Sequence, residues 1–261
     1  MTGFADLLRC PCQGDLVIDV ASAQCLKCGK VYESKNGVLC FDPDSGGSPE
    51  DALKSAEQKV RDDQASKYDK LMKASPHNFF EQKNIEGRLA GRHYHNTVEV
   101  GCGTGRYTSR LANCADRVVA VDRSLMSLYL NQIKLKERGL LDKVLLIQAD
   151  ATQLPLAQGA FDFGFSAQVL EHLPSADHRK RMIESIARSL LKDAQLLMTV
   201  YEWSRLGFGW RKKEGFHRGG IYYFRFTKSD LEEVLAPHFK VKEWQSFLGQ
   251  ILLADSIRTD R

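Results

Sequence analysis

The sequence predicts an α/β fold in which helices cover both faces of a largely parallel sheet, preceded by a small cysteine-rich module. Strand-like and helix-like segments alternate from Thr97 onward, which is typical of a parallel sheet. The first of these strands runs directly into a turn, residues 101–105, that has glycine at alternate positions. Four cysteines lie in two close pairs within the first 28 residues. These observations divide the chain into a cysteine-rich start and a sheet-forming remainder.

The composition is that of an ordinary globular protein. The 261 residues are 43% hydrophobic and 27% charged, with a formal net charge of +4. This charge is too small to require a nucleic-acid partner. No apolar run is long enough to span a bilayer, and the start of the chain lacks the pattern of a signal peptide. We therefore expect a cytoplasmic protein without membrane insertion and without a secreted partner.

Two cysteine pairs organise residues 1–43, namely Cys10, Cys12, Cys25 and Cys28. So short a segment has too little apolar surface to fold alone, and close cysteine pairs in a cytosolic chain indicate a metal site. Four thiolates would hold a structural zinc ion and supply the missing stability. The alternative is a metal-free module in which the cysteines pack as small hydrophobic side chains.

A linker and a helix are predicted between this module and the rest of the chain. Residues 42–49 are turn formers without an apolar side chain. Ser48 followed by Pro49 is typical of a capped helix start, and we expect the helix to end near Met72. The predicted organisation is a module at 1–43, a linker with the N-terminal helix at 44–76, and a sheet-forming domain at 77–261.

The sheet-forming domain alternates between the two kinds of element. Its predicted strands are 97–100, 117–121, 143–149, 161–166, 195–200, 240–247 and 250–253. Its predicted helices are 106–113, 124–138, 177–191 and 228–235. Such alternation places the carboxyl ends of the parallel strands at one edge, where α/β proteins bind their ligands.

The turn at residues 101–105 has the chemistry of a nucleotide-binding loop. Glycines leave the backbone free of Cβ atoms where a ligand lies against it, and the N–H groups at the following helix start can hold an anionic group. Glu99 precedes the turn, and Asp122 ends the next strand. An acid at that strand end suits the hydroxyls of a ribose. The dinucleotide fingerprint needs glycine where this chain has Arg106.

The run from Glu99 to Gly105, E-V-G-C-G-T-G, resembles motif I of the class I S-adenosylmethionine-dependent methyltransferases. Asp122, the strand end at Asp150, and the stretch from Phe161 to Leu173 with its L-E-H-L ending fall where that family has further motifs. The resemblance covers residues 78 to 255. It implies a Rossmann-like, seven-stranded class I sheet with an antiparallel pair at its edge, and a helix before motif I that closes over the cofactor.

This resemblance implies S-adenosylmethionine as the cofactor. Asp122 would accept the ribose hydroxyls, and Asp150 would accept the adenine amine while Ala151 offers a backbone N–H. The expected cofactor-binding residues are Glu99, Gly101, Cys102, Gly103, Gly105, Asp122, Arg123, Asp150, Ala151, Ser166 and Gln168. Without a ligand, Asp122 would only cap the helix that begins near Ser124, and Asp150 would only end a strand.

His172 is the candidate catalytic residue. Methyl transfer depends mainly on the alignment of donor and acceptor, and a base is needed only when the acceptor must lose a proton. His172 follows the fourth strand, where the acceptor has to arrive. The alternative is that its ring only packs, or caps the helix start near Pro174.

The cysteine module has a resemblance of its own. It is similar to the zinc ribbon of the tRNA-methyltransferase activator type, in which C-P-x-C is followed by C-x-x-C-G. The first pair here, Cys10-Pro11-Cys12, is one residue shorter, which changes the geometry of that turn.

The methyl acceptor is left open between a small molecule and RNA. Residues 201–220 interleave aromatic and basic side chains with glycines, and rings and cations of this kind can stack on unpaired bases and meet phosphates. The same segment could form a lid over an acidic metabolite. A scaffold that binds the cofactor without turnover is the third alternative, against which the intact glycine turn argues. The sequence identifies no protein partner.

Overall fold

The computed structural model describes residues 2–19, 21–41, 53, 55–65, 75–204, 212–217 and 220–259. Its strands are β1 (Leu16–Ile18), β2 (Ser22–Cys25), β3 (Val31–Lys35), β4 (Val38–Phe41), β5 (Tyr94–Val100), β6 (Ala115–Asp122), β7 (Val144–Ala149), β8 (Phe161–Ala167), β9 (Leu190–Tyr201), β10 (Glu214–Phe216), β11 (Tyr222–Phe224), β12 (Phe239–Phe247) and β13 (Ile251–Arg258). Its α-helices are α2 (Pro76–Leu89), α3 (Thr108–Asn113), α4 (Leu125–Glu137), α5 (Ala176–Ser189) and α6 (Lys228–Leu235), and residues 55–65 are also helical. Short 3₁₀ turns are η1 (Thr2–Leu7), η2 (Leu141–Lys143), η3 (Ala151–Gln153) and η4 (Leu170–His172).

Within these residues one large sheet has the order β1-β2-β3-β4-β7-β6-β5-β8-β9-β13-β12. The strands from β7 to β9 are parallel, so their carboxyl ends share one edge. Strand β13 runs antiparallel between β9 and β12. This confirms the predicted Rossmann-like class I sheet and its antiparallel final pair.

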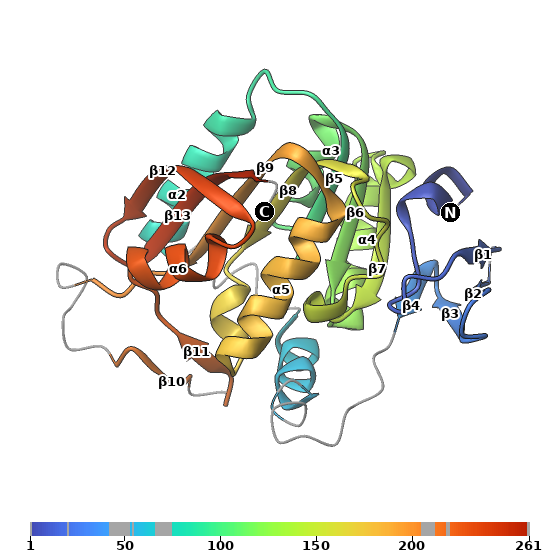
Figure 1. The fold of residues 1–261 in the computed structure, drawn as a ribbon, viewed down its shortest axis with the longest axis horizontal. Helices are drawn as coiled ribbons and strands as arrows, with labels where there is room; N and C mark the ends of the chain where they lie inside the picture. Colours follow the sequence, from blue (N-terminus) through green and yellow to red (C-terminus); the bar gives the residue numbers. More distant parts are fainter. Residues whose placement is uncertain are drawn as a thin grey trace.

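Helices cover both faces of this sheet, because its central strands are apolar on both sides (Figure 1). On one face, Met182 and Ile186 of α5 and Leu231 of α6 pack in one core cluster. On the other face, Ile85 of α2 and Leu128 of α4 belong to a second cluster. The sheet therefore forms a rigid platform between two hydrophobic cores.

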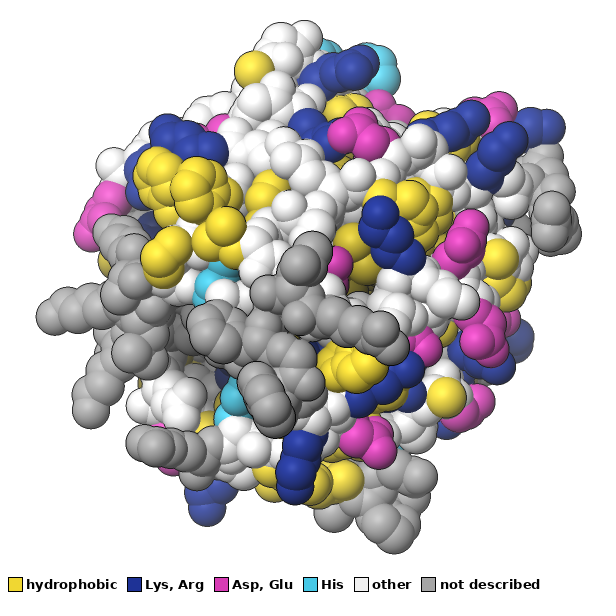
Figure 2. Space-filling view, turned by 90° about the vertical axis from the view of Figure 1, so that its left-hand side faces the viewer, with side chains coloured by type: hydrophobic (Ala, Val, Ile, Leu, Met, Phe, Trp, Pro, Cys, Tyr) yellow, Lys and Arg dark blue, Asp and Glu magenta, His cyan; other side chains and the backbone are white. Residues whose placement is uncertain are grey.

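The surface drawn in Figure 2 mixes both signs of charge. Lys and Arg side chains alternate there with Asp and Glu side chains, and hydrophobic groups lie between them. Among the described helices, none is long and apolar enough to cross a membrane. A cytoplasmic location stays a prediction.

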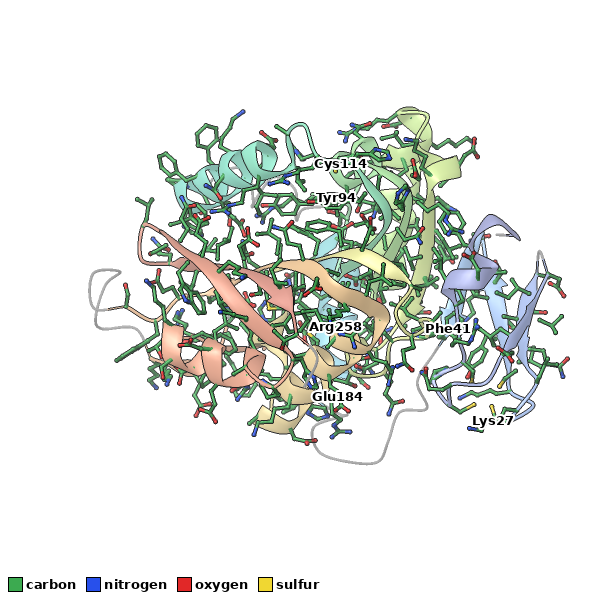
Figure 3. All side chains as sticks on the ribbon, turned by 45° about the horizontal axis from the view of Figure 1, so that its top comes forward. Lys27, Phe41, Tyr94, Cys114, Glu184 and Arg258 are labelled. Atoms are coloured by element: carbon green, nitrogen blue, oxygen red, sulfur yellow. The ribbon has the colours of Figure 1, made fainter. Side chains whose placement is uncertain are left out.

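The cysteine-rich module is joined to the sheet edge. Strand β4 pairs in parallel with β7, so that Phe41 lies opposite Ala149. The module is also joined to the loop after η3. Leu8 forms an isolated antiparallel β-bridge with Leu156, and Arg9 N–H donates to the Pro155 carbonyl oxygen at 3.0 Å. Figure 3 shows Phe41 at this junction, between the module and the rest of the sheet. Because β4 covers it, β7 is not an exposed edge strand.

Several elements differ from the sequence-based prediction. Helix α2 and strand β2 were not predicted, nor was the β10–β11 hairpin. The predicted helix 177–191 ends at Ser189, because Leu190 already pairs with Phe161 as the first residue of β9. Leu190 and Leu191 are apolar, so they continue a helical pattern equally well.

Some predictions fall outside the described residues. These are the linker at 42–49, the helix start at Ser48 and Pro49, the helix end near Met72, and part of the segment 201–220, namely 205–211, 218 and 219. The domain boundaries at 1–43, 44–76 and 77–261 stay a prediction.

Candidate active site

A pocket opens at the carboxyl ends of the parallel strands, as the α/β rule predicts. The strand ends β5 to β8 form its floor, and the helix at 55–65 contributes a further wall. The lining residues are Glu57, Gln58, Arg61, Gln64, Ala65, Val100, Gly101, Gly103, Thr104, Val121, Asp122, Arg123, Ser124, Ser127, Ala149, Asp150, Ala151, Ala167, Gln168, Val169, His172 and Leu173.

The glycine turn is shaped by close packing beneath it. Gly101 has φ +76°, and a Cβ atom there would meet a Val169 methyl group at 2.1 Å. Gly105 has φ +83°, and a Cβ atom there would meet Asn131 Oδ1 at 2.1 Å. Both positions therefore require glycine, for conformation and for space. Gly101 borders the pocket, whereas Gly105 packs against α4.

Asp122 holds the turn from the end of β6. Its two oxygens accept hydrogen bonds from Gly103 N–H at 2.7 Å and from Ser124 N–H at 2.8 Å. Each carboxylate oxygen keeps a further lone pair for a ligand hydroxyl. Burial raises the pKa of this carboxyl, and the two backbone hydrogen bonds oppose that shift. Asp122 thus combines the loop-fixing role and the ligand-facing position.

Asp150 lies at the end of the neighbouring strand. One oxygen accepts from Thr152 N–H and its hydroxyl, both at 2.8 Å, which caps η3. The other oxygen is paired with Arg123 at 3.1 Å. Arg123 in turn donates to Gln58 of the overlying helix. Side chains from β6, β7 and the helix thus meet at this corner of the pocket.

Two predicted residues lie beneath the pocket lining. Glu99 is fully enclosed, and burial raises its pKa to about 8, with the nearby Asp122 charge adding to the shift. Ser166 is also buried, and its hydroxyl has no hydrogen-bond partner among the described residues. Burial of Glu99 therefore favours its neutral acid form over the carboxylate.

His172 borders the pocket at the opposite end from Asp150. Its Nδ1 lies 2.8 Å from the Tyr222 carbonyl oxygen. A carbonyl only accepts, so Nδ1 carries the proton and Nε2 keeps its lone pair. Burial, together with the positive charge of Arg61, lowers the pKa of His172 well below its usual value. The ring is therefore neutral at pH 7, with a basic nitrogen available.

Three more rings gather around His172 and form what we call the ring cluster, consisting of His172, Tyr201, His217 and Tyr223. The ring centroids are 5.5 Å apart for His172 and Tyr201, and 4.6 Å apart for His217 and Tyr223. Arg225 lies over the Tyr223 ring at 4.1 Å. The β10–β11 hairpin supplies two of these four rings, His217 and Tyr223, and β9 supplies Tyr201. Tyr201 and His217 belong to the predicted covering segment 201–220, which thus adjoins the pocket through residues that the structure describes.

The four cysteines of the module converge. Their sulfur atoms lie within 4.8 Å of one another, with Cys10 Sγ 3.7 Å from Cys28 Sγ and Cys12 Sγ 3.6 Å from Cys25 Sγ. Four sulfurs at about 2.3 Å from a tetrahedral zinc ion are about 3.8 Å apart. A Cβ atom on Gly14 would meet Cys25 Sγ at 2.7 Å, so glycine gives the shortened first pair room to turn. The donor set fits zinc.

The structure brings most of the predicted residues to the pocket, though not all. The lining includes Gly101, Gly103, Asp122, Arg123, Asp150, Ala151, Gln168 and His172. The lining does not include Glu99, Cys102, Gly105 or Ser166. Sequence reasoning named no side chain from the helix at 55–65, such as Glu57 and Arg61, because its sparse apolar pattern does not show which side faces a ligand.

Comparison with known proteins finds a family match in the central part of the chain. Residues 98–198 match the family model described as a methyltransferase domain. A ubiquinone/menaquinone biosynthesis C-methyltransferase of Stutzerimonas stutzeri is 30% identical over 144 residues, which are 52% of this chain and 54% of that protein. The chain thus spans about half the length of the curated relatives it matches.

Solved structures share the fold. The 1,6-didemethyltoxoflavin-N1-methyltransferase of Burkholderia thailandensis superposes with a TM-score of 0.67 at 18% identity, over 90% of this chain and 98% of that one. A chain from the complex of the Haloferax volcanii Trm112 methyltransferase activator with a methyltransferase gives 0.62 at 15% identity, over 77% and 98%. Residues 98–198 are therefore similar to a methyltransferase domain, and the surrounding sheet has the Rossmann-like fold of these solved methyltransferase structures.

Proposed function

We propose that this protein transfers a methyl group from S-adenosylmethionine to an acceptor bound beside His172. The observation that carries the proposal is the pocket itself. Its floor places Asp122 and Asp150 on neighbouring strand ends, with the bare glycine turn on one side and His172 at the far end. The methyltransferase-domain match covers the strands that supply these residues.

The residues present fit this cofactor. Asp122 has lone pairs for the two ribose hydroxyls. Asp150 would accept a hydrogen bond from the adenine amine, and the Ala151 N–H would donate to the adenine ring. Arg123 would keep its ion pair with Asp150. At Gly103, which lines the pocket, a Cβ atom would meet no other atom within 4 Å, so the bare backbone there is open to the ligand. The cofactor supplies a methyl group made electrophilic by the adjacent sulfonium. The chain therefore has to align the acceptor and exclude water.

His172 would act as the base when the acceptor has a proton to lose. Its Nε2 lone pair is fixed by the Tyr222 carbonyl on Nδ1, and its lowered pKa keeps that nitrogen free of a proton at neutral pH. General-base catalysis by such a group contributes about 10²- to 10⁴-fold in rate.

A small, flat aromatic acceptor suits the described surroundings best. The ring cluster provides aromatic faces beside His172, and such faces favour stacked or edge-on aromatic partners. Similar methyltransferases are named for ubiquinone/menaquinone biosynthesis, for 1,6-didemethyltoxoflavin and for cobalt-precorrin-6B, none of which is a nucleic acid. On the face drawn in Figure 2, the described Lys and Arg side chains are mixed with Asp and Glu side chains, so this face lacks the continuous basic patch typical of nucleic-acid-binding proteins.

RNA is the alternative acceptor. Its support is the resemblance of the module to a methyltransferase activator and the similarity to a chain from a complex with such an activator. Incubation with methyl-labelled cofactor and either total RNA or a metabolite extract separates the two. The proposal predicts label in the small-molecule fraction, whereas label in RNA alone would overturn the small-molecule assignment. No transfer to either fraction, from protein that binds the cofactor, would favour the scaffold alternative.

For the module, we propose a structural zinc ion held by Cys10, Cys12, Cys25 and Cys28. The sulfur spacing supports tetrahedral thiolate coordination. Around the sulfurs, Lys27 N–H and Cys28 N–H donate to Cys25 Sγ at 3.3 and 3.4 Å. The Tyr32 hydroxyl lies 3.1 Å from Cys10 Sγ, where it would donate to a thiolate. Donors that hydrogen-bond to a thiolate in this way stabilise it when it binds a metal ion.

A further inference from the structure

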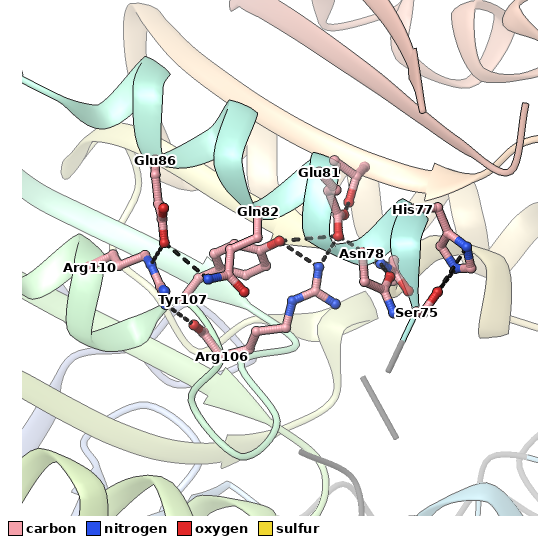
Figure 4. Close-up of polar contacts among 11 residues, drawn as sticks. Ser75, His77, Asn78, Glu81, Gln82, Glu86, Arg106, Tyr107 and Arg110 are labelled. Carbon is pink, nitrogen blue, oxygen red and sulfur yellow. Dashed lines mark hydrogen bonds and ion pairs between the residues drawn. The ribbon is translucent and has the colours of Figure 1, made fainter. Parts of the chain in front are cut away.

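Glu81 of helix α2 is a buried carboxylate that accepts several hydrogen bonds, and the proposed reaction assigns it no role. Its side chain is 0% exposed. It accepts hydrogen bonds from Arg106, from the Tyr107 hydroxyl at 3.1 Å and from the Thr199 hydroxyl at 2.6 Å. Figure 4 shows Glu81 pointing toward Arg106 and Tyr107, at the end of the glycine turn. One carboxylate thus links α2 to the turn and to β9.

The fourth partner of Glu81 is the side chain of Gln168, which lines the pocket. Gln168 Nε2 lies 2.9 Å from Glu81 Oε2 and 3.0 Å from Asn78 Oδ1. A carboxylate paired with arginine only accepts hydrogen bonds, so the amide atom that faces it must be the NH₂ group. Both amide hydrogens are then used, and the orientation of the amide follows from chemistry.

The carbonyl oxygen of Gln168 is left for the pocket. Among the described residues no hydrogen bond to Gln168 Oε1 is present, and this atom is not among the buried unpartnered ones. Gln168 also has φ +58°, a left-handed conformation that is unfavourable for a residue with a Cβ atom. The backbone conformation of Gln168 and the two hydrogen bonds of its amide nitrogen thus fix the side chain, so that Oε1 is the acceptor left for the pocket.

We propose that Glu81 is a positioning residue, which fixes the Gln168 amide so that Oε1 receives the ammonium group of the cofactor's methionine portion. This rests on the proposed function, since it assumes that S-adenosylmethionine occupies the pocket. With the amide reversed, an NH₂ group would face the ammonium, and two donors would oppose each other. The negative charge of Glu81 acts through Gln168, because Glu81 itself does not border the pocket.

The test compares two ligands by calorimetry: S-adenosylhomocysteine, and its analogue with hydrogen in place of the amino group. A hydrogen bond to a charged group is typically worth about 10-fold or more in affinity, so wild-type protein should prefer the amino ligand by about that factor. In Glu81→Gln the new amide oxygen would stay at the Oε2 position, which faces the Arg106 and Gln168 donors. Its NH₂ group would face the Thr199 hydroxyl. The hydrogen bond from Gln168 Nε2 then has a neutral acceptor in place of a charged one, so this variant should reduce the preference for the amino ligand while its affinity for the analogue stays within about 2-fold.

Glu86→Gln is the matched control. Glu86 lies further along α2 and pairs with Arg110 at 2.6 Å, as Figure 4 also shows. Neither of these two residues lines the pocket. It should keep the wild-type preference. Equal weakening of both ligands by Glu81→Gln, or an unchanged preference, would overturn the proposal, because a merely structural role affects both ligands alike.

A second variant covers the case in which Glu81→Gln does not fold. Asn78→Leu removes the other acceptor of the amide hydrogens and leaves the Arg106–Glu81 pair in place. It should reduce the preference for the amino ligand partially, and a full wild-type preference would contradict the proposal. Failure of wild-type protein to bind either ligand would instead overturn the proposed function, so the two failures are distinguishable.

Discussion

Replacing Asp122 with asparagine should separate ligand binding from folding. The carboxylate accepts one backbone hydrogen bond on each oxygen, at 2.7 and 2.8 Å. Asparagine has a single oxygen, so one of Gly103 N–H and Ser124 N–H would face an NH₂ group. The ribose hydroxyls would likewise lose one of two charged acceptors. A hydrogen bond to a charged group contributes about 1.5–3 kcal/mol, so S-adenosylhomocysteine should bind about 10- to 100-fold more weakly.

The effect of Asp122→Asn on stability should be smaller than its effect on binding. Burial raises the pKa of Asp122, which means that the fold already disfavours the ionised form, and a neutral amide recovers part of that cost. Calorimetric titration measures binding, and thermal unfolding measures stability. Asp116→Asn, at the exposed start of the same strand, is the control and should change neither. Unaltered affinity in Asp122→Asn would refute the assignment of Asp122 to the ribose.

Three further outcomes are expected. Purified protein should contain one zinc ion per chain, and this ion should be lost in Cys12→Ser. It should be kept in the control His95→Ala, which removes a donor from the exposed group His93, His95 and Asp116. Metal analysis that shows the reverse would contradict the thiolate site. If His172 is the base, His172→Ala should lower kcat about 10²-fold or more. Since the pKa of His172 is lowered, wild-type kcat should stay level from pH 6.5 to 8. An inflection of wild-type kcat near pH 6.5 would argue against the lowered pKa of His172. Burial raises the pKa of Glu171 from 4.5 to about 8. The contribution of this group to stability is therefore complete below pH 4.5 and is lost as the pH rises toward 8. Glu171→Gln should reduce the fall in unfolding free energy between pH 5 and 8, and an unchanged pH dependence would contradict this.

The parts of the fold that could be predicted are those in which local pattern and tertiary role agree. The strands from β5 to β8 are apolar and bounded by turn residues, so their pattern allows one interpretation. The glycine turn could also be located, because its glycines are required by conformation. Asp122 and Asp150 followed from their position at strand ends, since parallel strands bring those ends to one edge.

Elements that depend on long-range contacts could not be predicted. Helix α2 mixes buried polar residues, Asn78 and Glu81, with the exposed rings of Phe79 and Phe80. It therefore lacks an apolar stripe, although Ser75 before Pro76 is a helix-start signal. The polar residues are buried because they bind Gln168 and Arg106, which are distant in sequence. The pairing of β4 with β7 joins residues over 100 positions apart, and no local pattern indicates it.

A crystal structure of the protein grown with S-adenosylhomocysteine would test the proposed binding mode directly. We predict the ribose hydroxyls on Asp122, the adenine edge at Asp150 and Ala151, and the sulfur directed toward the His172 end of the pocket. A ligand bound elsewhere, or one lying in the pocket with its adenine toward His172, would contradict this binding mode.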